Sequence, residues 1–171
     1  MLNYQLMVTR LGVKKWGHKQ IIVGVVCIIC LIKSLNKSLK IIMIQSQIDK
    51  IIKAAIEMAT QLNVSIAVSI VDTGGHLRAF MRMEECSYAS IEASRKKAVS
   101  ASAFKMPTDV IGDVIQKVPT LRDAFTSFPD IFTLGGGLPI IVNGKLIGGI
   151  GVSGLDSAGD KAIAEKSLLA L

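Results

Sequence analysis

Four residues at alternate positions of one short segment carry the side chains best suited to binding a ligand. They are His76, Arg78, Phe80 and Arg82, and a strand would place all four on one face because its side chains alternate. Two guanidiniums, an imidazole and an aromatic ring suit a planar anionic ligand: arginine pairs with carboxylates through two hydrogen bonds, and neutral histidine binds haem iron. The alternative is a solvated strand face that ends in a turn histidine.

The other face of the same segment is apolar. It carries Leu77, Ala79, Met81 and Met83, which we expect to belong to the hydrophobic core.

Lys97 is a second candidate for ligand binding. In a predicted helix it lies four residues from both Ala93 and Ala101, on a small-residue face that could pack closely against a sheet. A lysine in such a place either extends its amine to solvent or meets an anion. Both alternatives stay open.

Glycine clusters provide a third candidate. Gly135, Gly136 and Gly137 precede Leu138, and Gly151 and Ser153 follow in a later glycine-rich segment. Their backbone N–H groups could cradle an anion, although structural turns need glycine too. The later segment formally matches GxGxxG, but only 17 residues follow Gly154, too few for the rest of a dinucleotide-binding unit.

Other chemistries have too few of the required residues. His18 and His76 are the only histidines, which excludes a multi-histidine metal site. Three cysteines cannot form a disulfide framework, and no GxSxG sequence is present. Cys27 and Cys30 lie in an apolar run, and Cys86 is expected to be a buried thiol.

The net charge of +7 comes from one end of the chain. Residues 1–42 contain seven of the 20 Lys and Arg residues and no Asp or Glu, so the other 13 cations balance all 13 acidic residues. A nucleic-acid-binding protein needs a basic patch on its folded domain. We therefore expect no nucleic-acid partner.

Residues 1–42 form an N-terminal extension to a domain that spans residues 43–171. Ile21–Ile32 is a run of twelve apolar residues, shorter than the roughly 20 of a membrane-spanning helix and similar to a signal-peptide core. Three alternatives stay open for the extension. Met43 could be the true start, with residues 1–42 a dispensable segment translated from upstream of it; the extension could be a signal or anchor; or it could be part of the domain. The first alternative implies a cytoplasmic protein, whereas the second implies export or membrane tethering.

The pattern of the domain predicts an α+β fold. About five antiparallel strands form a small sheet flanked by helices, in a profilin-like layered architecture. The expected helices are 46–63, 87–104, 107–117, a short helix or turn after Pro119, and 156–171. The expected strands are 64–72, 76–83, 131–134, 138–142 and 146–152, with Asn143-Gly144 as a hairpin turn.

Several of these motifs occur together in the order of a known family. They are Val71-Asp72-Thr-Gly-Gly75, His76–Met83, Lys97–Ala101, Gly136-Gly137-Leu-Pro139, and Gly148–Gly154 with Asp160. The domain thereby resembles the GlcG/HbpS family, which includes the C-terminal domain of PduO-type proteins. One departure is Arg82-Met-Glu-Glu-Cys86, where the family usually has an Arg-Met-Asp-Gly-Ala type of sequence.

The resemblance implies a haem- or tetrapyrrole-binding homo-oligomer, with haem degradation as an activity. His76 would then be the iron ligand, with Arg78, Arg82 or Lys97 pairing with the propionates. One alternative is an accessory protein or enzyme of small-carboxylate (glycolate-type) or corrinoid metabolism without haem, which would use Lys97 and the glycine segments. Another is a non-enzymatic redox or ligand sensor.

Overall fold

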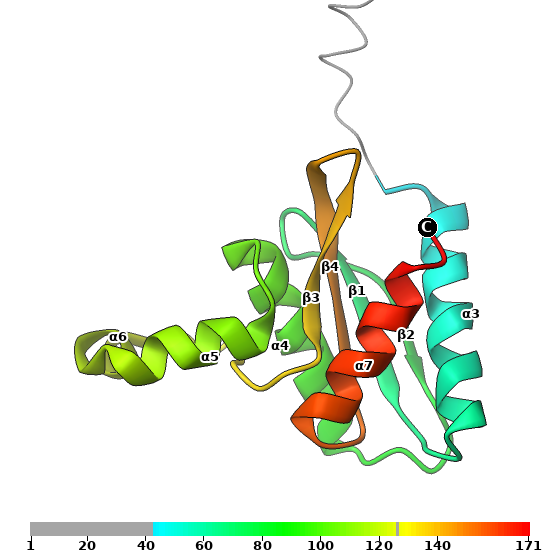
Figure 1. Ribbon diagram of the computed structural model, residues 1–171, viewed down its shortest axis with the longest axis horizontal. Coiled ribbons are helices and arrows are strands. Elements are labelled where there is room, and N and C mark those ends of the chain that lie inside the picture. Colours follow the sequence, from blue (N-terminus) through cyan, green and yellow to red (C-terminus); the bar gives the residue numbers. More distant parts are fainter. Residues whose placement is uncertain (1–42, 126) are drawn as a thin grey trace, which may run out of the picture. The chain divides into compact units, whose positions relative to one another are not determined.

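A four-stranded antiparallel sheet lies between two layers of helices in the computed structural model (Figure 1). The structure describes residues 43–125 and 127–171, so the expectations for residues 1–42, including the apolar run, His18, Cys27 and Cys30, lie outside it. The strands follow the order β2-β1-β4-β3. Their bounds are β1 (Ala67–Asp72), β2 (Leu77–Arg82), β3 (Gly137–Val142) and β4 (Lys145–Ser153).

The helices divide between the two faces of the sheet (Figure 1). Helices α3 and α7 cover one face, α4 covers the other, and α5 and α6 extend from the end of α4. Their bounds are α3 (Gln45–Gln61), α4 (Ala89–Phe104), α5 (Thr108–Lys117), α6 (Pro119–Phe125) and α7 (Ser157–Leu168). The α+β fold with helices flanking an antiparallel sheet is confirmed.

The main hydrophobic core lies under α3 and α7. Helix α3 contributes Ile48, Ile51, Ala55 and Ala59, whose spacing of three and four residues defines one face of a helix. They pack against alternate residues of the central strands, among them Val68 and Ile70. Helix α3 begins one residue before Ser46, the expected cap, and the Ile44 N–H instead donates to Gln47 Oε1.

The fold has four strands in its described part, and the expected strand at 131–134 is wrong. Side chains of α4 and α5 bind the backbone of this segment in place of a neighbouring strand. The Phe132 N–H donates to Ser100 Oγ at 2.7 Å, and Thr108 Oγ1 donates to the Leu134 carbonyl oxygen at 2.7 Å. The segment is therefore an extended loop held by helices.

Helix α4 approaches β4 so closely that two positions of this strand have room only for glycine. A Cβ atom at Gly149 would overlap the carbonyl oxygen of Ala98, and one at Gly151 would overlap that of Ser94. The face of α4 that meets these glycines is made of small residues and one lysine: Ser90, Ser94, Lys97, Ala98, Ala101 and Ser102. Ser94 Oγ and Ser69 Oγ of β1 form a buried hydrogen bond at 2.8 Å.

Gly151→Ala tests this close approach. The added methyl group would force α4 away from β4, and overpacking of this kind costs roughly 1–3 kcal/mol. We expect a lower free energy of unfolding, measured by chemical denaturation of the full chain.

Gly159→Ala in α7 is the matched control. Its Cβ would come no closer than 3.1 Å to side-chain atoms of Leu155 and Asp156, and alanine favours a helix by about 1 kcal/mol over glycine. The control should be neutral or stabilising. Equal destabilisation by the two substitutions would contradict the close-packing argument.

Candidate functional site

The turn between β1 and β2 holds His76 against Asp72. Asp72 Oδ1 accepts hydrogen bonds from the backbone N–H groups of Gly74 at 2.8 Å and His76 at 3.0 Å. The His76 Nδ1 atom lies 3.2 Å from Asp72 Oδ1 and 3.3 Å from Oδ2. Gly74 leaves room for the ring, since a Cβ there would lie 2.8 Å from His76 Cε1.

This contact determines which nitrogen of His76 carries the proton. Burial alone would raise the pKa of Asp72, but the N–H groups of His76 and Gly74 and the His76 ring outweigh it and lower that pKa. Asp72 is therefore an ionised acceptor at neutral pH, and Nδ1 of the neutral ring must be the donor. Because the His76 side chain is 82% exposed, its Nε2 lone pair is available to an incoming metal.

A bulge in β2 changes the face on which some side chains lie. Val71 pairs with Leu77 and Ile70 with Ala79, so the register shifts by one residue at Arg78. Directly paired residues share a face. Leu77 therefore lies on the α4 side of the sheet, together with Phe80, which pairs with Ser69.

The expected separation of an apolar face from a ligand-binding face in β2 is thus partly wrong. Ala79 and Met83 pack against the core as expected, but Leu77 and Met81 are about half exposed. Side chains of β2 do not alternate strictly between the two faces because the bulge inserts an extra residue. In addition, β2 is an edge strand, so most of its residues are exposed on either face. Of these two exposed side chains, Leu77 lies next to His76 on the α4 side, whereas Met81 pairs with Val68 on the other face.

The two arginines of β2 differ in their partners. Arg78 is exposed and lies at the bulge, two residues after His76. Arg82 is also exposed, and its Nη1 donates to the Cys86 carbonyl oxygen at 3.4 Å. At about 3.3 Å of strand rise per residue, Arg78 starts nearer to His76 than Arg82 does.

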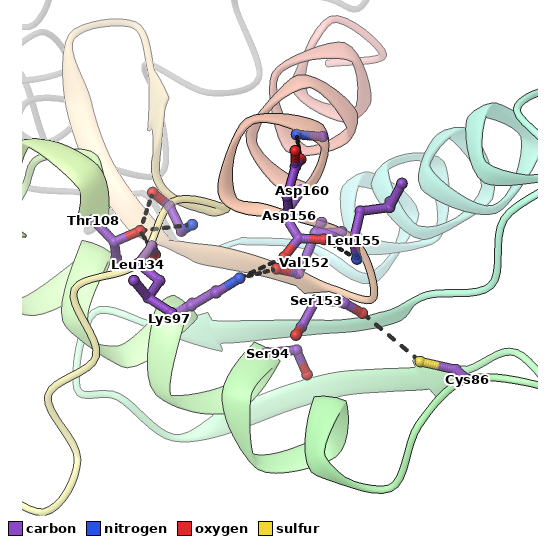
Figure 2. A network of polar contacts seen from close by, with 12 residues as sticks. Cys86, Ser94, Lys97, Thr108, Leu134, Val152, Ser153, Leu155, Asp156 and Asp160 are labelled. Carbon is purple, nitrogen blue, oxygen red and sulfur yellow. Dashed lines mark hydrogen bonds and ion pairs between the residues drawn. The ribbon is translucent and has the colours of Figure 1, made fainter.

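Lys97 is not part of this cluster. Figure 2 shows its amine directed between β4 and α7, where Nζ donates to Asp160 Oδ2 at 2.6 Å and to the Val152 carbonyl oxygen at 3.1 Å. The side chains of Lys97 and Asp160 are 3% and 1% exposed. His76 precedes β2, on the other half of the sheet from these contacts.

The anion that Lys97 meets is therefore a side chain of the same protein. Burial raises the pKa of Asp160, against the opposing effects of the Lys97 amine and the backbone N–H groups of Leu155 and Gly154. The Leu155 N–H donates to Asp160 Oδ1 at 2.9 Å. This pair joins α4 to the first turn of α7, where the helix dipole also favours a carboxylate.

The glycine segments also have partners within the protein. The Gly137 N–H donates to Thr108 Oγ1 at 3.0 Å, and the Gly136 carbonyl oxygen accepts from the Val152 N–H at 2.9 Å. Gly135, Gly136 and Gly151 are buried. The Ser153 carbonyl oxygen faces Cys86 Sγ at 3.8 Å, and Cys86 is a buried free thiol as expected.

Asp72 is the member of the candidate site that the analysis of side-chain types did not single out. The feature of the sequence that could have indicated its role is Asp-Thr-Gly-Gly-His, in which two glycines allow the chain to turn and bring the carboxylate to the imidazole. Within the described ranges no group of three or more His, Cys, Asp or Glu residues could hold a metal ion. Those ranges likewise include no helix with the length and hydrophobicity of a membrane span.

Comparison with known proteins finds relatives along most of the domain. Residues 44–168 match the family described as "Haem degrading protein HbpS-like". Protein GlcG of Escherichia coli is 34% identical over 114 residues, covering 67% of this chain and 83% of that protein. The "uncharacterized 15.0 kDa protein in dhaT-dhaS intergenic region" of Citrobacter freundii is 36% identical over 136 residues, covering 78% and 96%.

The domain also resembles solved structures. The crystal structure of a PduOC:haem complex superposes with a TM-score of 0.72 at 33% sequence identity, covering 77% of this chain and 96% of that one.

A double-mutant cycle tests the buried ion pair. Lys97→Met leaves a buried carboxylate without its partner, which typically costs about 3–5 kcal/mol. Asp160→Asn in the same chain removes that charge and should recover part of the loss, as measured by chemical denaturation. Additive effects of the two substitutions would contradict the pairing.

The same cycle predicts a pH dependence. In Lys97→Met the pKa of Asp160 rises further above its unfolded value, so the carboxyl group is protonated without penalty at low pH. The Lys97→Met variant should therefore lose stability as the pH rises through the pKa that Asp160 has in the folded variant, because the buried carboxyl group then ionises without a partner. The deficit relative to wild type should be smaller at acidic than at neutral pH, and a deficit independent of pH would contradict this assignment.

Proposed function

The chain belongs to the HbpS-like family, and from that premise and the Asp72–His76 pair we propose that it binds haem with His76 Nε2 as an iron ligand. The observation that carries this proposal is the Nδ1–H···carboxylate hydrogen bond, which leaves Nε2 bare and exposed. Histidines that bind metals typically donate their other N–H group to a carboxylate or carbonyl oxygen. A histidine Nε2 atom whose Nδ1–H group binds a carboxylate is therefore a suitable ligand for haem iron.

Asp72 has two roles in this arrangement. It fixes the backbone of the turn through the Gly74 and His76 N–H groups, and it holds the Nδ1 proton of the ring. The ring orientation is therefore set before any ligand arrives.

The surroundings of His76 are suited to a large apolar ring with acidic groups. Leu77 and Phe80 lie on the same side of β2, and a Cβ at Gly75 would lie 3.8 Å from Val99 Cγ1 of α4. These side chains would contact the macrocycle, and the Arg78 guanidinium would pair with a propionate. Haem supplies redox-active iron once bound.

The comparisons support this proposal at the level of the family. The family is described by haem degradation, and the structural relative is a PduOC:haem complex. The alternative of a small-carboxylate site has less support from the geometry. The Lys97 amine and the Gly137 N–H that would form its anion cradle already bind Asp160 and Thr108.

Haemin titration of the full chain tests the iron ligand. Wild type should give a saturable Soret shift, which His76→Ala should lose. Asp72→Asn keeps the oxygen that accepts the turn N–H bonds but removes the charge, so we expect affinity to fall by about 10–100-fold, as for other partners of metal-binding histidines. An unchanged Soret band and affinity in His76→Ala would contradict the proposal.

A second titration tests the propionate partner. Arg78→Gln should weaken haemin binding, by up to about tenfold for the loss of one exposed charge pair, while Arg82→Gln should have a smaller effect. Lys145→Gln, an exposed cation at the start of β4, is the control for net charge. Equal weakening by all three variants would indicate only a general electrostatic effect and would exclude Arg78 as a specific partner.

A further inference from the structure

Ser102 of α4 joins this helix to the Asp72–His76 turn. Ser102 is 3% exposed, and its Oγ donates to the backbone carbonyl oxygen of Asp72 at 3.1 Å. The Gly75 N–H donates to the same carbonyl oxygen at 3.1 Å and closes the turn. Within the described residues, Ser102 supplies the one hydrogen bond to this turn from a side chain of another element.

The Ser102 hydroxyl donates out of its own helix. A serine inside a helix commonly donates to a carbonyl oxygen three or four residues earlier, as Ser94 of α4 does to that of Ile91 at 2.9 Å. In the described part of the chain Ser102 makes no bond of this kind, and its acceptor is Asp72 at the end of β1. The hydroxyl therefore connects two elements instead of stabilising the helix that carries it.

The position of Ser102 is fixed relative to the sheet. A Cβ at Gly149 of β4 would lie 3.1 Å from both the Cβ and the backbone nitrogen of Ser102, so the helix rests on the strand at this residue. Val99, three residues earlier, also reaches the turn, since its Cγ1 would lie 3.8 Å from a Cβ at Gly75. Helix α4 thus contacts the turn at two points, and Ser102 provides the polar contact.

We propose that Ser102 is a positioning residue for the His76 imidazole, an inference that rests on the proposed role of His76 as an iron ligand. The Ser102 hydroxyl fixes the peptide group that follows Asp72. The Asp72 carboxylate, in turn, binds the N–H groups of Gly74 and His76 and the ring nitrogen Nδ1. A rotation of the backbone at Asp72 would change these three contacts together.

Loss of this hydroxyl should loosen the ring without unfolding the turn. The Asp72 carbonyl oxygen would still accept from the Gly75 N–H, so the turn keeps its closing hydrogen bond. The carboxylate would be held less firmly towards Nδ1, and the neutral imidazole can then carry its proton on Nε2 instead. A protonated Nε2 has no lone pair for iron, so haem binding should weaken.

The first test follows the ring proton of the full chain without haem. The NMR chemical shifts of the two imidazole nitrogens report which of them carries the proton, and the measurement is made at about pH 8, where an ordinary histidine is neutral. We expect mainly the Nδ1–H form of His76 in wild type and a larger fraction of the Nε2–H form in Ser102→Ala. The spectrum of His76→Ala identifies the signals, because His18 is the only other histidine.

The second test is haemin titration of the same variants. Because a buried hydrogen bond typically changes an equilibrium constant by about three- to tenfold, Ser102→Ala should weaken haemin binding by that factor. Ser102→Cys keeps the volume of the side chain but has only a weak donor, so it should resemble Ser102→Ala in both tests. Wild-type behaviour of Ser102→Cys would show that the volume matters and not the hydroxyl, and would overturn the proposal.

The matched control is Ser100→Ala. Ser100 is a fully buried serine of the same helix, and its hydroxyl binds the backbone of Asp130 and Phe132 instead of the turn. This control should keep the ring proton and the haemin affinity of wild type, and thermal unfolding followed by circular dichroism verifies that all variants fold. Equal effects of Ser100→Ala and Ser102→Ala, or an unchanged ring proton or affinity in Ser102→Ala, would each overturn the proposal.

Failure of this role is distinguishable from failure of the proposed function. Wild-type haemin affinity in His76→Ala would overturn His76 as the iron ligand, whereas the ring-proton measurement, which needs no haem, still decides whether Ser102 positions the imidazole. Loss of haemin binding in His76→Ala, together with no effect of Ser102→Ala in either test, would overturn only the role of Ser102.

Discussion

The contact between the backbone of α4 and the glycines of β4 is the constraint on which the rest of the domain depends. Gly149 and Gly151 carry no Cβ, so the carbonyl oxygens of Ala98 and Ser94 reach the strand directly. At this distance α4 can present only serine and alanine to the sheet. Any larger side chain on that face must pass beside the strand, which is the path that Lys97 takes towards β3 and α7.

Lys97 consequently connects layers that the hydrophobic core does not connect. The core lies on the α3 and α7 side of the sheet, whereas Lys97 comes from the helix on the opposite side and binds Asp160 in α7. Together with the Val152 carbonyl oxygen, this ion pair holds α4, β4 and α7 in one arrangement. The most buried charges of the described domain are therefore structural.

Of the charged candidate residues, those that remain exposed to a ligand lie at the edge of the sheet. Helix α4 packs against β1, β4 and β3, and β2 is left as an exposed edge strand after the Asp72–His76 turn. That turn is rigid because Asp72 binds it from within, but its imidazole is open to solvent. Under the proposed function, the His76 imidazole is an iron ligand that the turn orients in advance on this exposed edge.

Helices and strands could be predicted from the sequence where apolar residues recur with a helical period or where the residues of a tight turn are present. Ile48, Ile51, Ala55 and Ala59 specify α3, and Asn143-Gly144 specifies the β3–β4 hairpin with Asn143 and Gly144 both at positive φ. Residues 131–134 have the composition of a strand, but side chains from distant helices satisfy their backbone. Such long-range hydrogen bonds leave no local pattern.

The candidate site was predictable to a similar extent. The side-chain types of β2 indicated His76 and its neighbours, but the bulge at Arg78 depends on the register with β1 and moves Leu77 to the other face. The position of Lys97 on a small-residue face left two alternatives open, an amine extended to solvent or one that meets an anion, and the structure shows the second. The sequence could not distinguish a bound ligand from Asp160, because that choice depends on where α7 packs.

The most direct test of the central claim is imidazole rescue of His76→Gly in the full chain, followed by the Soret band of added haemin. The account predicts that the variant lacks the wild-type spectrum and that added imidazole restores it, because free imidazole can occupy the position of the deleted ring. A wild-type spectrum in the variant without imidazole would contradict the assignment of His76 as the iron ligand.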